Sequence, residues 1–231
     1  MGFQTRFERV ECKFLLTNEQ KEAFLADIME RLRPDAYGRS TICNLYFDTP
    51  DYRLIRTSLE KPVYKEKLRL RSYGQVAEDG TTFAEIKKKF KDVVYKRRIV
   101  LPQDAAMDFL CNGGPTPPSQ IGREIAYLFE YYRELAPRVY LSYEREAYYD
   151  KNDKDLRFTF DTNVLYRRED LSLTSPVYGH PLLKEGQVLL EIKTAGAIPY
   201  WVVEALSRHK IYKSSFSKYG NAYLHFSSVH K

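Results

Sequence analysis

Apolar and polar residues alternate with a period of two along most of the chain, which is the pattern of half-buried β-strands. Turn chemistry such as Thr49-Pro50-Asp51 separates several of these segments, and short connections of this kind favour antiparallel neighbours. The expected strands are residues 5–16, 40–48, 63–73, 82–90, 94–101, 138–149, 155–161 and 187–194. About eight strands close readily into a barrel. The pattern therefore predicts an α+β fold built on a closed antiparallel β-barrel, with helices packed outside it and at its ends.

Other segments carry the signals of helices. Thr17-Asn18-Glu19-Gln20 forms a capping-box pattern before an apolar stripe that runs from Phe24 to Leu32. Ser119 is placed to cap a second helix after the Gly- and Pro-rich break at 113–118. Further helical segments are expected after Pro102 and over residues 199–210 and 217–228. At 231 residues the chain is short enough to form one elaborated domain, and the break at 113–118 is interpreted as an internal loop, so residues 1–231 are expected to form a single domain.

The alternation separates each strand into an apolar face and a face of charged residues. The same charged pattern recurs in nearly every strand. The residues on these faces are Arg9, Glu11 and Lys13; Lys65, Lys67, Arg69 and Arg71; Glu85, Lys87 and Lys89; Lys96 and Arg98; Tyr143 and Arg145; Arg157, Thr159 and Asp161; and Glu191 and Lys193.

For any one strand, the simplest interpretation is that the charged face points into water. The recurrence of Arg and Lys favours a different interpretation, in which these faces line a shared interior. Like charges ~4 Å apart repel by ~4 kcal/mol at an effective dielectric constant of ~20, so such an interior requires a polyanion. The formal net charge of +6 and the pI near 9.0 agree with an anionic partner.

Carboxylates on the same faces predict a divalent cation, because Mg²⁺ and Mn²⁺ prefer carboxylate, phosphate and water ligands. Glu191 is the first candidate ligand, followed by Glu11 and Glu85. Salt bridges to neighbouring Lys or Arg are an equally good interpretation for Glu85.

Several short motifs in order along the chain resemble a known family. They are Glu11-Cys12-Lys13-Phe14, Tyr46-Phe47-Asp48-Thr49, the segment 67–74 (KLRLRSYG), Glu85-Ile86-Lys87, Tyr143-Glu144-Arg145, Arg157 before Phe160-Asp161-Thr162, Leu190-Glu191-Ile192-Lys193 and Ser217-Lys218-Tyr219. Together they resemble the VTC (vacuolar transporter chaperone) polyphosphate polymerase domain, a branch of the triphosphate tunnel metalloenzymes that also include CYTH-like phosphatases and cyclases. The resemblance spans almost the whole chain.

The resemblance implies a phosphate-binding role for many of the charged residues. The expected catalytic residues are Arg69, Arg71, Arg145, Arg157 and Lys193; the expected substrate-binding residues are Lys13, Lys87, Lys96, Arg98, Tyr143, Ser217 and Lys218; and the expected metal ligands are Glu191, Glu11 and Glu85. The implied reaction moves the terminal phosphoryl group of ATP onto a polyphosphate chain, with Mn²⁺ or Mg²⁺ as cofactor.

Two positions depart from the family pattern and keep alternatives open. Arg9 stands where the hydrolytic branch carries the first Glu of its ExExK motif, which counts against a metal-dependent triphosphatase or NTPase. Ser215 stands where the polymerase tail carries a Lys, although Lys213 is close by, and this favours a non-catalytic polyphosphate-binding sensor. Nucleic-acid binding ranks last, because a closed bore admits no duplex and no RNP or OB motif is present.

The remaining residue types point away from other kinds of site. Cys12, Cys43 and Cys111 are expected to be ordinary buried thiols, and the four histidines lie outside the charged strand faces. No segment approaches the ~20 apolar residues of a membrane span, so a cytoplasmic location is expected. A membrane-protein partner and the oligomeric state are left open.

Overall fold

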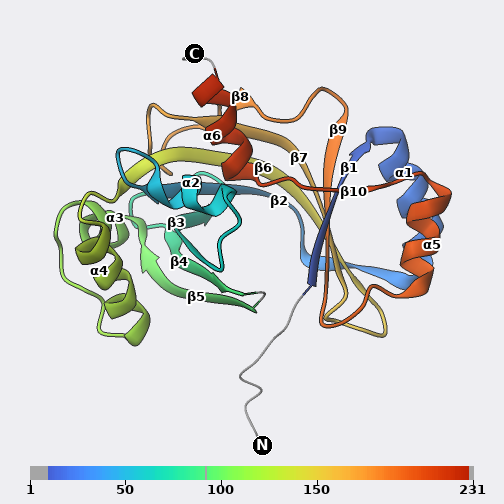
Figure 1. The fold of residues 1–231 in the computed structure, drawn as a ribbon, viewed down its shortest axis with the longest axis horizontal. Helices are drawn as coiled ribbons and strands as arrows, with labels where there is room; N and C mark the ends of the chain where they lie inside the picture. Colours follow the sequence, from blue (N-terminus) through green and yellow to red (C-terminus); the bar gives the residue numbers. More distant parts are fainter. Residues whose placement is uncertain (1–9, 92, 229–231) are drawn as a thin grey trace, which may run out of the picture. The chain divides into compact units, whose positions relative to one another are not determined.

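The computed structural model describes residues 10–91 and 93–228, in which runs of consecutive strands are separated by helices (Figure 1). The strands are β1 (Val10–Thr17), β2 (Leu32–Asp48), β3 (Tyr64–Tyr73), β4 (Thr81–Phe90), β5 (Val93–Pro102), β6 (Ala136–Asp150), β7 (Arg157–Arg167), β8 (His180–Pro181), β9 (Gln187–Thr194) and β10 (Lys213–Ser214). The helices are α1 (Asn18–Ile28), the 3-10 turn η1 (Met29–Arg31), α2 (Arg53–Leu59), α3 (Gln103–Cys111), α4 (Gln120–Tyr132), α5 (Tyr200–Arg208) and α6 (Lys218–Ser228).

The capping signals at two helix starts are confirmed. The Gln20 amide donates to Thr17 Oγ1 at 3.2 Å while the Thr17 amide donates to Gln20 Oε1 at 3.1 Å, which completes the capping box of α1. Ser119 accepts from the Gly122 amide at the start of α4. The prediction that the apolar helical stripe continues to Leu32 is wrong, because α1 ends at Ile28 and Leu32 belongs to β2.

The eight expected strands are present, but the expected closed barrel is wrong. The hydrogen-bonded order is β10-β1-β9-β7-β6-β2-β3-β4-β5, with β8 paired to β7, and the pairings of defined register are antiparallel. Within residues 10–91 and 93–228, no pairing joins the terminal strands β10 and β5, so the sheet is open. The physical reason is the length of β10: two residues offer too short a ladder for the ten-residue β5.

The described residues form two compact units. Unit 1 contains the described residues up to Ser40 together with Tyr143–Val164 and Leu183–Ser217, and unit 2 contains Thr41–Ser142, Leu165–Leu182 and the described residues from Lys218. The strands β2, β6 and β7 contribute residues to both units. That residues 1–231 form a single domain stays a prediction, and each unit has its own hydrophobic core.

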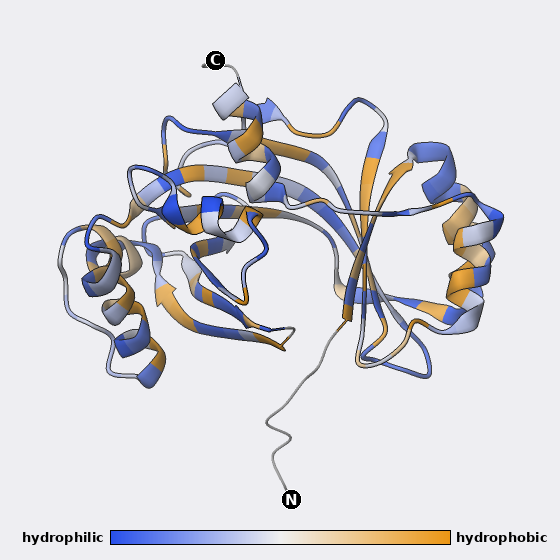
Figure 2. Ribbon diagram, viewed as in Figure 1, coloured by the Kyte–Doolittle hydropathy of each residue, from blue (hydrophilic) through white to orange (hydrophobic). Residues whose placement is uncertain are grey.

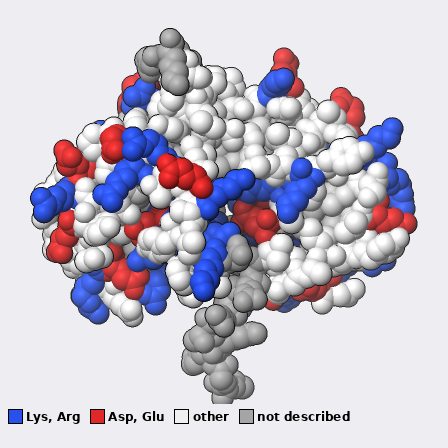
Figure 3. Space-filling view, in the orientation of Figure 1, with Lys and Arg blue, Asp and Glu red and all other residues white. Residues whose placement is uncertain are grey.

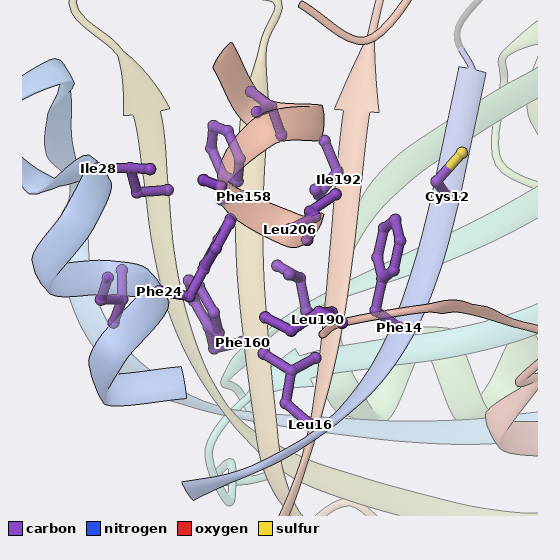
Figure 4. Packing of buried hydrophobic residues seen from close by; sticks show 14 of the residues in the cluster. Cys12, Phe14, Leu16, Phe24, Ile28, Phe158, Phe160, Leu190, Ile192 and Leu206 are labelled. Carbon is purple, nitrogen blue, oxygen red and sulfur yellow. The ribbon is translucent and has the colours of Figure 1, made fainter. Parts of the chain in front are cut away.

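The apolar strand faces of unit 1 are covered by α1 and α5 (Figure 4). Phe24 of α1 packs on Phe158 and Phe160 of β7 with ring centroids 6.4 and 6.5 Å apart. Leu206 of α5 and Ile192 of β9 belong to the same cluster of buried side chains. This core contains alternate residues of β1, β7 and β9. The charged residues that alternate with them therefore lie on the opposite face of the sheet.

Unit 2 has its own core between β2–β4 and the helices α3 and α4. Leu68 and Leu70 of β3 are fully buried, together with Ile125 and Leu128 of α4. The strand ribbons change repeatedly between hydrophilic and hydrophobic residues along their length (Figure 2). As in unit 1, burial of one parity places the charged residues of β3 and β4 on the other face.

Three smaller expectations have mixed outcomes. Cys12 and Cys43 are buried thiols as expected, whereas Cys111 is exposed. Across the described residues, none of the helices has the length and apolar character needed to span a bilayer. Arg9 and the first residues of the strand expected at 5–16 lie outside the described residues.

Candidate functional site

A row of polar side chains crosses four strands of unit 1 on the face opposite its core. Lys13 of β1 lies opposite both Ser214 of β10 and Glu191 of β9, and Glu191 lies opposite Thr159 of β7. Directly opposed residues of antiparallel strands point to the same face. Ser214, Lys13, Glu191 and Thr159 are therefore neighbours by register, although their positions in the sequence are far apart.

Ion pairs join this row to further charged residues. The Glu191 carboxylate lies 3.6 Å from Lys13 Nζ, 3.7 Å from Arg145 Nη2 and 3.5 Å from Lys193 Nζ. Lys13 Nζ is also 3.2 Å from Glu11 Oε1 and donates to the Phe216 carbonyl at 3.0 Å. We call Glu191, Glu11, Lys13, Arg145 and Lys193 the Glu191 cluster.

Asp161 fixes the orientation of Arg145 within this cluster. Arg145 Nε and Nη2 donate to the two Asp161 oxygens at 2.6 and 2.7 Å, and Asp161 is fully buried. A bidentate pair of this kind holds a guanidinium in one plane. Tyr143, 4% exposed, places its ring 5.0 Å from the Arg145 guanidinium. Arg145 is therefore held in place before any ligand arrives.

Two buried hydroxyl groups beside the Glu191 cluster are unsatisfied. Among the described residues, Thr159 Oγ1 and Ser214 Oγ have no hydrogen-bond partner, and Thr159 is 8% exposed. Unsatisfied buried polar atoms are uncommon in folded proteins and point to an additional ligand, ion or water. Both hydroxyl groups lie in the row of Lys13 and Glu191, so a group that satisfied them would lie beside the Glu191 cluster.

The donor set of the Glu191 cluster fits a divalent metal that arrives with phosphate. Glu11 and Glu191 supply two carboxylates that meet the same Lys13 ammonium. Within the described part of the chain, no group of three or more His, Cys, Asp or Glu side chains is arranged to hold an ion by itself. Mg²⁺ commonly uses one or two protein carboxylates and takes its other ligands from substrate phosphates and water.

A second cluster lies in unit 2 around Glu85, which is 1% exposed. Arg69 Nε donates to Glu85 Oε2 at 2.7 Å, and Lys96 Nζ lies 2.8 Å from Glu85 Oε1. Arg71 Nε is 3.8 Å from the same carboxylate and donates to Asn44 Oδ1 at 3.0 Å. We call Glu85, Arg69, Arg71 and Lys96 the Glu85 cluster, in which three cations share one buried carboxylate.

The proximity of these charges changes their protonation. Burial raises the pKa of the Glu85 carboxyl group, but Arg69, Arg71 and Lys96 outweigh burial and lower this pKa to about 2. Burial lowers the pKa of Lys96 to about 8; Arg69 and Arg71 act in the same direction and Glu85 opposes them. At neutral pH, Glu85 is ionised and Lys96 is close to its titration range.

The remaining expected site residues lie on the predicted faces but have other neighbours. Arg157 pairs with Asp35 at 3.5 Å, and the Arg98 guanidinium lies 5.0 Å from the centre of the Phe83 ring. Lys87 is exposed on β4, opposite Lys67 and Lys96. Ser217 directly precedes α6, and Lys218 is its first residue and is 9% exposed. That all these faces line one enclosed cavity stays a prediction.

Several residues that support the clusters have no role predicted from the sequence. Asn44 holds Arg71, Asp161 holds Arg145, and Tyr46 accepts a hydrogen bond from Arg69 at 3.1 Å. Tyr46 and Asp161 both belong to motifs that carried the family resemblance. That membership was the available signal, because nothing in strand alternation distinguishes a supporting residue from a solvent-facing one.

The surface shows both signs of charge. On the face seen in Figure 3, Lys and Arg side chains lie among Asp and Glu side chains and do not form one unbroken basic patch. The histidines contact other groups, since His209 pairs with Asp27 and His225 with Tyr166, and His230 lies outside the described residues. The expectation that no duplex can enter rested on barrel closure, and an open sheet removes that reason.

Comparison with solved structures shows the fold. The chain resembles a candidate adenylate cyclase from Vibrio parahaemolyticus, with a TM-score of 0.56, 13% identity, and coverage of 95% of this chain and 99% of that chain. A candidate adenylate cyclase from Bacillus halodurans is similar with a TM-score of 0.57 and 14% identity, and the match covers 90% of this chain and 93% of that chain. A candidate adenylyl cyclase from Hippeastrum, described as having a dominant triphosphatase activity, is similar with a TM-score of 0.56 and 16% identity. The match covers 91% of this chain and 93% of that chain.

Sequence comparisons give the family. No curated protein sequence matches the chain. The VTC domain profile matches residues 8–227, which is nearly the full length of the chain and includes every motif of the Glu191 and Glu85 clusters. The resemblance noted from the motifs is therefore confirmed, and the chain belongs to the VTC domain family.

Proposed function

We propose that this protein transfers the terminal phosphoryl group of ATP onto the end of a polyphosphate chain. The observation that carries the proposal is the Glu85 cluster, where Arg69, Arg71 and Lys96 gather on one buried carboxylate in a member of the VTC domain family. Cations held in place before the reaction stabilise a transferring phosphoryl group without reorganisation.

Lys96 makes the Glu85 cluster accessible to a ligand. Its side chain is 44% exposed, while its ammonium group bonds to Glu85. An ammonium group has three N–H donors, so the Lys96 contact with Glu85 leaves capacity for phosphate oxygens. Glu85 then serves as a counter-ion that keeps the cations together in the absence of phosphate, which agrees with the salt-bridge interpretation of this residue.

In unit 1, the Glu191 cluster supplies a second set of groups suited to phosphate. Arg145, held by Asp161, and Lys193 present positive charge beside Glu191, and Thr159 and Ser214 present hydroxyl groups. Glu191 and Glu11 would hold the divalent cation. When bound, such a cation neutralises charge on phosphate oxygens and aligns them for in-line displacement.

The reaction needs no protein base. A terminal phosphate oxygen of the acceptor chain attacks the γ-phosphorus of ATP, and the bond from that phosphorus to the bridging β–γ oxygen breaks to release ADP. Both the nucleophile and the leaving group are already ionised at neutral pH. The protein's contribution is orientation and charge stabilisation by Arg and Lys side chains, which agrees with histidines that lie outside both clusters.

Hydrolysis of triphosphate or of a nucleoside triphosphate is the second candidate. It is favoured by the similarity of the fold to the Hippeastrum protein with triphosphatase activity. In that case water replaces the acceptor chain at the same residues. A binding protein without turnover is the third candidate and would use the same cations.

One assay separates these candidates. The purified protein is incubated with ATP and Mn²⁺ and the products are resolved on a polyacrylamide gel. A ladder of phosphate chains is the expected result, free phosphate alone would show hydrolysis, and unchanged ATP with measurable tripolyphosphate binding would show a sensor. Arg69→Lys is the matched variant for each activity, because it keeps the charge and loses the planar donors that reach Glu85 and Tyr46.

A further inference from the structure

Two motif residues that carry no assigned role, Asp48 and Tyr219, meet in unit 2. Asp48 is the last residue of β2 and belongs to the motif Tyr46-Phe47-Asp48-Thr49, while Tyr219 is the second residue of α6 and belongs to Ser217-Lys218-Tyr219. The Tyr219 hydroxyl donates to Asp48 Oδ2 at 2.8 Å. Both residues are buried, with exposed fractions of 0% and 2%.

The Asp48 carboxylate is a rigid acceptor. Besides Tyr219 it accepts from the backbone amides of Thr49, Leu54 and Ile55 at 2.8 to 3.0 Å. Leu54 and Ile55 lie in the first turn of α2, so one carboxylate joins the end of β2, the start of α2 and the start of α6. A buried carboxylate that accepts several directed donors fixes their relative positions, because each lost contact leaves a desolvated group.

From Tyr219 the contacts continue to the Glu85 cluster. The Tyr219 ring stacks on the Tyr46 ring with centroids 4.5 Å apart and an interplanar angle of 23°. The Tyr46 hydroxyl accepts from Arg69 Nη1 at 3.1 Å, and Arg69 in turn donates to Glu85. Tyr46, Arg69 and Glu85 are also opposed in register across β2, β3 and β4.

The arrangement is more specific than ordinary core packing. A tyrosine needed only for its volume does not need to place its hydroxyl on a fully buried carboxylate, since Phe has nearly the same shape. The hydroxyl fixes the Tyr219 ring, this ring supports Tyr46, and the Tyr46 hydroxyl takes one of the Arg69 donors. The neighbour of Tyr219 in α6 is Lys218, an expected phosphate-binding residue.

We propose that Asp48 is a positioning residue, which acts through Tyr219 and Tyr46 to hold the Arg69 guanidinium and the start of α6 ready for a phosphate ligand. This inference rests on the proposed phosphate-binding function of the Glu85 cluster. It assigns no contact between Asp48 and the ligand.

Three substitutions test the inference, together with a matched control. Tyr219→Phe removes the hydroxyl and keeps the ring, Tyr46→Phe removes the acceptor of Arg69, and Asp48→Asn keeps the size and removes the charge. The control is Tyr166→Phe, because the Tyr166 hydroxyl makes a 2.6 Å hydrogen bond to His225 of the same helix α6, and this bond is not one of the contacts that join Asp48 to Arg69. All four are measured in the full chain.

The first readout requires no ligand. The Nε–H resonance of Arg69 is assigned by its loss in Arg69→Lys and followed by ¹⁵N NMR in each variant. We expect Tyr219→Phe and Asp48→Asn to shift this resonance and Tyr166→Phe to leave it unchanged. An Arg69 resonance that is identical in Tyr219→Phe and the unsubstituted protein would overturn the inference, whatever happens to stability.

The second readout is the affinity for tripolyphosphate, measured by calorimetry with and without Mn²⁺. Loss of one positioning hydrogen bond should weaken binding roughly fivefold to tenfold in Tyr219→Phe. In a double-mutant cycle, Tyr219→Phe should add little to Tyr46→Phe, because both act on Arg69 through the same contact. Additive effects, or equal weakening in Tyr166→Phe, would show a general structural role and reject the inference.

Failure of the inference is distinguishable from failure of the proposed function. If the unsubstituted protein binds neither tripolyphosphate nor ATP, the phosphate-binding proposal is wrong, while the Arg69 resonance still reports whether Asp48 positions that side chain. If the unsubstituted protein binds tripolyphosphate and Tyr219→Phe binds it equally well, only the positioning role is wrong.

Discussion

Arg69 lies opposite Glu85 across β3 and β4, and its Nε donates to Glu85 Oε2 at 2.7 Å while Arg71 and Lys96 approach the same carboxylate. Glu85 therefore occupies the position that an anionic ligand of these cations would share. This relationship separates two roles for Glu85, since a counter-ion competes with phosphate whereas a metal ligand assists its binding.

Glu85→Gln should tighten the binding of tripolyphosphate in the absence of metal, by roughly tenfold, because a competing negative charge is removed. The measurement is calorimetry in the presence of EDTA, with Glu124→Gln as the control. Weaker binding of tripolyphosphate by Glu85→Gln, seen only when Mn²⁺ is present, would instead identify Glu85 as a metal ligand.

The same substitution should lower the free energy of unfolding by about 3 kcal/mol, because it leaves buried cations without their shared partner. The lowered pKa of Glu85, about 2, sets the pH range of this effect. The stabilisation is complete above the ordinary pKa of 4.5 and is lost as the pH falls through about 2. Urea unfolding at several pH values should therefore show that the free energies of unfolding of Glu85→Gln and of the unsubstituted protein become equal in acid. A difference that stays constant with pH would contradict the assignment.

Lys96→Arg should remove a pH dependence of ligand binding. With a pKa of about 8, Lys96 loses its proton as the pH rises through 8, and the affinity for tripolyphosphate falls. The free energy of unfolding changes in the opposite direction and rises between a pH of about 8 and the ordinary Lys pKa of 10.5. In this range the unfolded chain holds the Lys96 proton and the folded chain does not. Arginine remains charged throughout, so binding by Lys96→Arg should be flat from pH 7 to 9. The same decline in both proteins would place the titrating group elsewhere.

Strand alternation is sufficient to predict which strand face carries the residues of each cluster, but not which of these residues become neighbours. Lys13, Glu191 and Thr159 were each placed on a charged face, and a period of two is all that this requires. Their adjacency depends on β1 and β7 flanking β9, a long-range pairing that no local pattern encodes. Arg157 was on the predicted face but turns to Asp35, because a long side chain has freedom that its Cβ direction does not determine.

The errors in the fold have equally local causes. The helix α2 was missed because it has only seven residues and starts after Tyr52 in a left-handed conformation, with φ of 58°. Seven residues are too few to show a helical stripe, and the carboxylate that accepts from its first turn is Asp48, outside the helix. Barrel closure was inferred from strand number alone, whereas it depends on the length of the terminal strands, one of which has two residues.

Glu191→Gln should weaken metal binding by about tenfold or more, and remove the dependence of turnover on Mn²⁺. The direct measurement is electron paramagnetic resonance of free Mn²⁺ during titration of the protein with tripolyphosphate present. Asp35→Asn is the matched control, because Asp35 is an acidic residue of unit 1 that pairs with Arg157 and does not belong to the Glu191 cluster. Unchanged Mn²⁺ binding and a normal rate in Glu191→Gln would rule out Glu191 as the ligand.

Lys193→Ala should lower turnover by about a hundredfold or more, because it removes a cation of the Glu191 cluster that is placed to stabilise phosphoryl transfer. The circular dichroism spectrum should be unchanged, since the Lys193 side chain is 30% exposed and lies on the face opposite the core. Lys184→Ala is the control for loss of a positive charge from the exposed surface of unit 1. Unfolding of Lys193→Ala would favour a structural salt bridge.

Thr159→Val tests whether the unsatisfied hydroxyl serves a ligand. Among the described residues Thr159 Oγ1 has no hydrogen-bond partner, so replacing the hydroxyl by a methyl group of similar size removes a buried polar atom that is not compensated. The free energy of unfolding should stay the same or rise by about 1 kcal/mol, while the affinity for tripolyphosphate with Mn²⁺ should fall. Thr82→Val is the contrasting variant, because Thr82 Oγ1 donates to the Leu101 carbonyl and its loss should reduce stability without affecting binding. A Thr159→Val protein that is less stable and binds tripolyphosphate normally would show that this hydroxyl has a structural partner and no ligand.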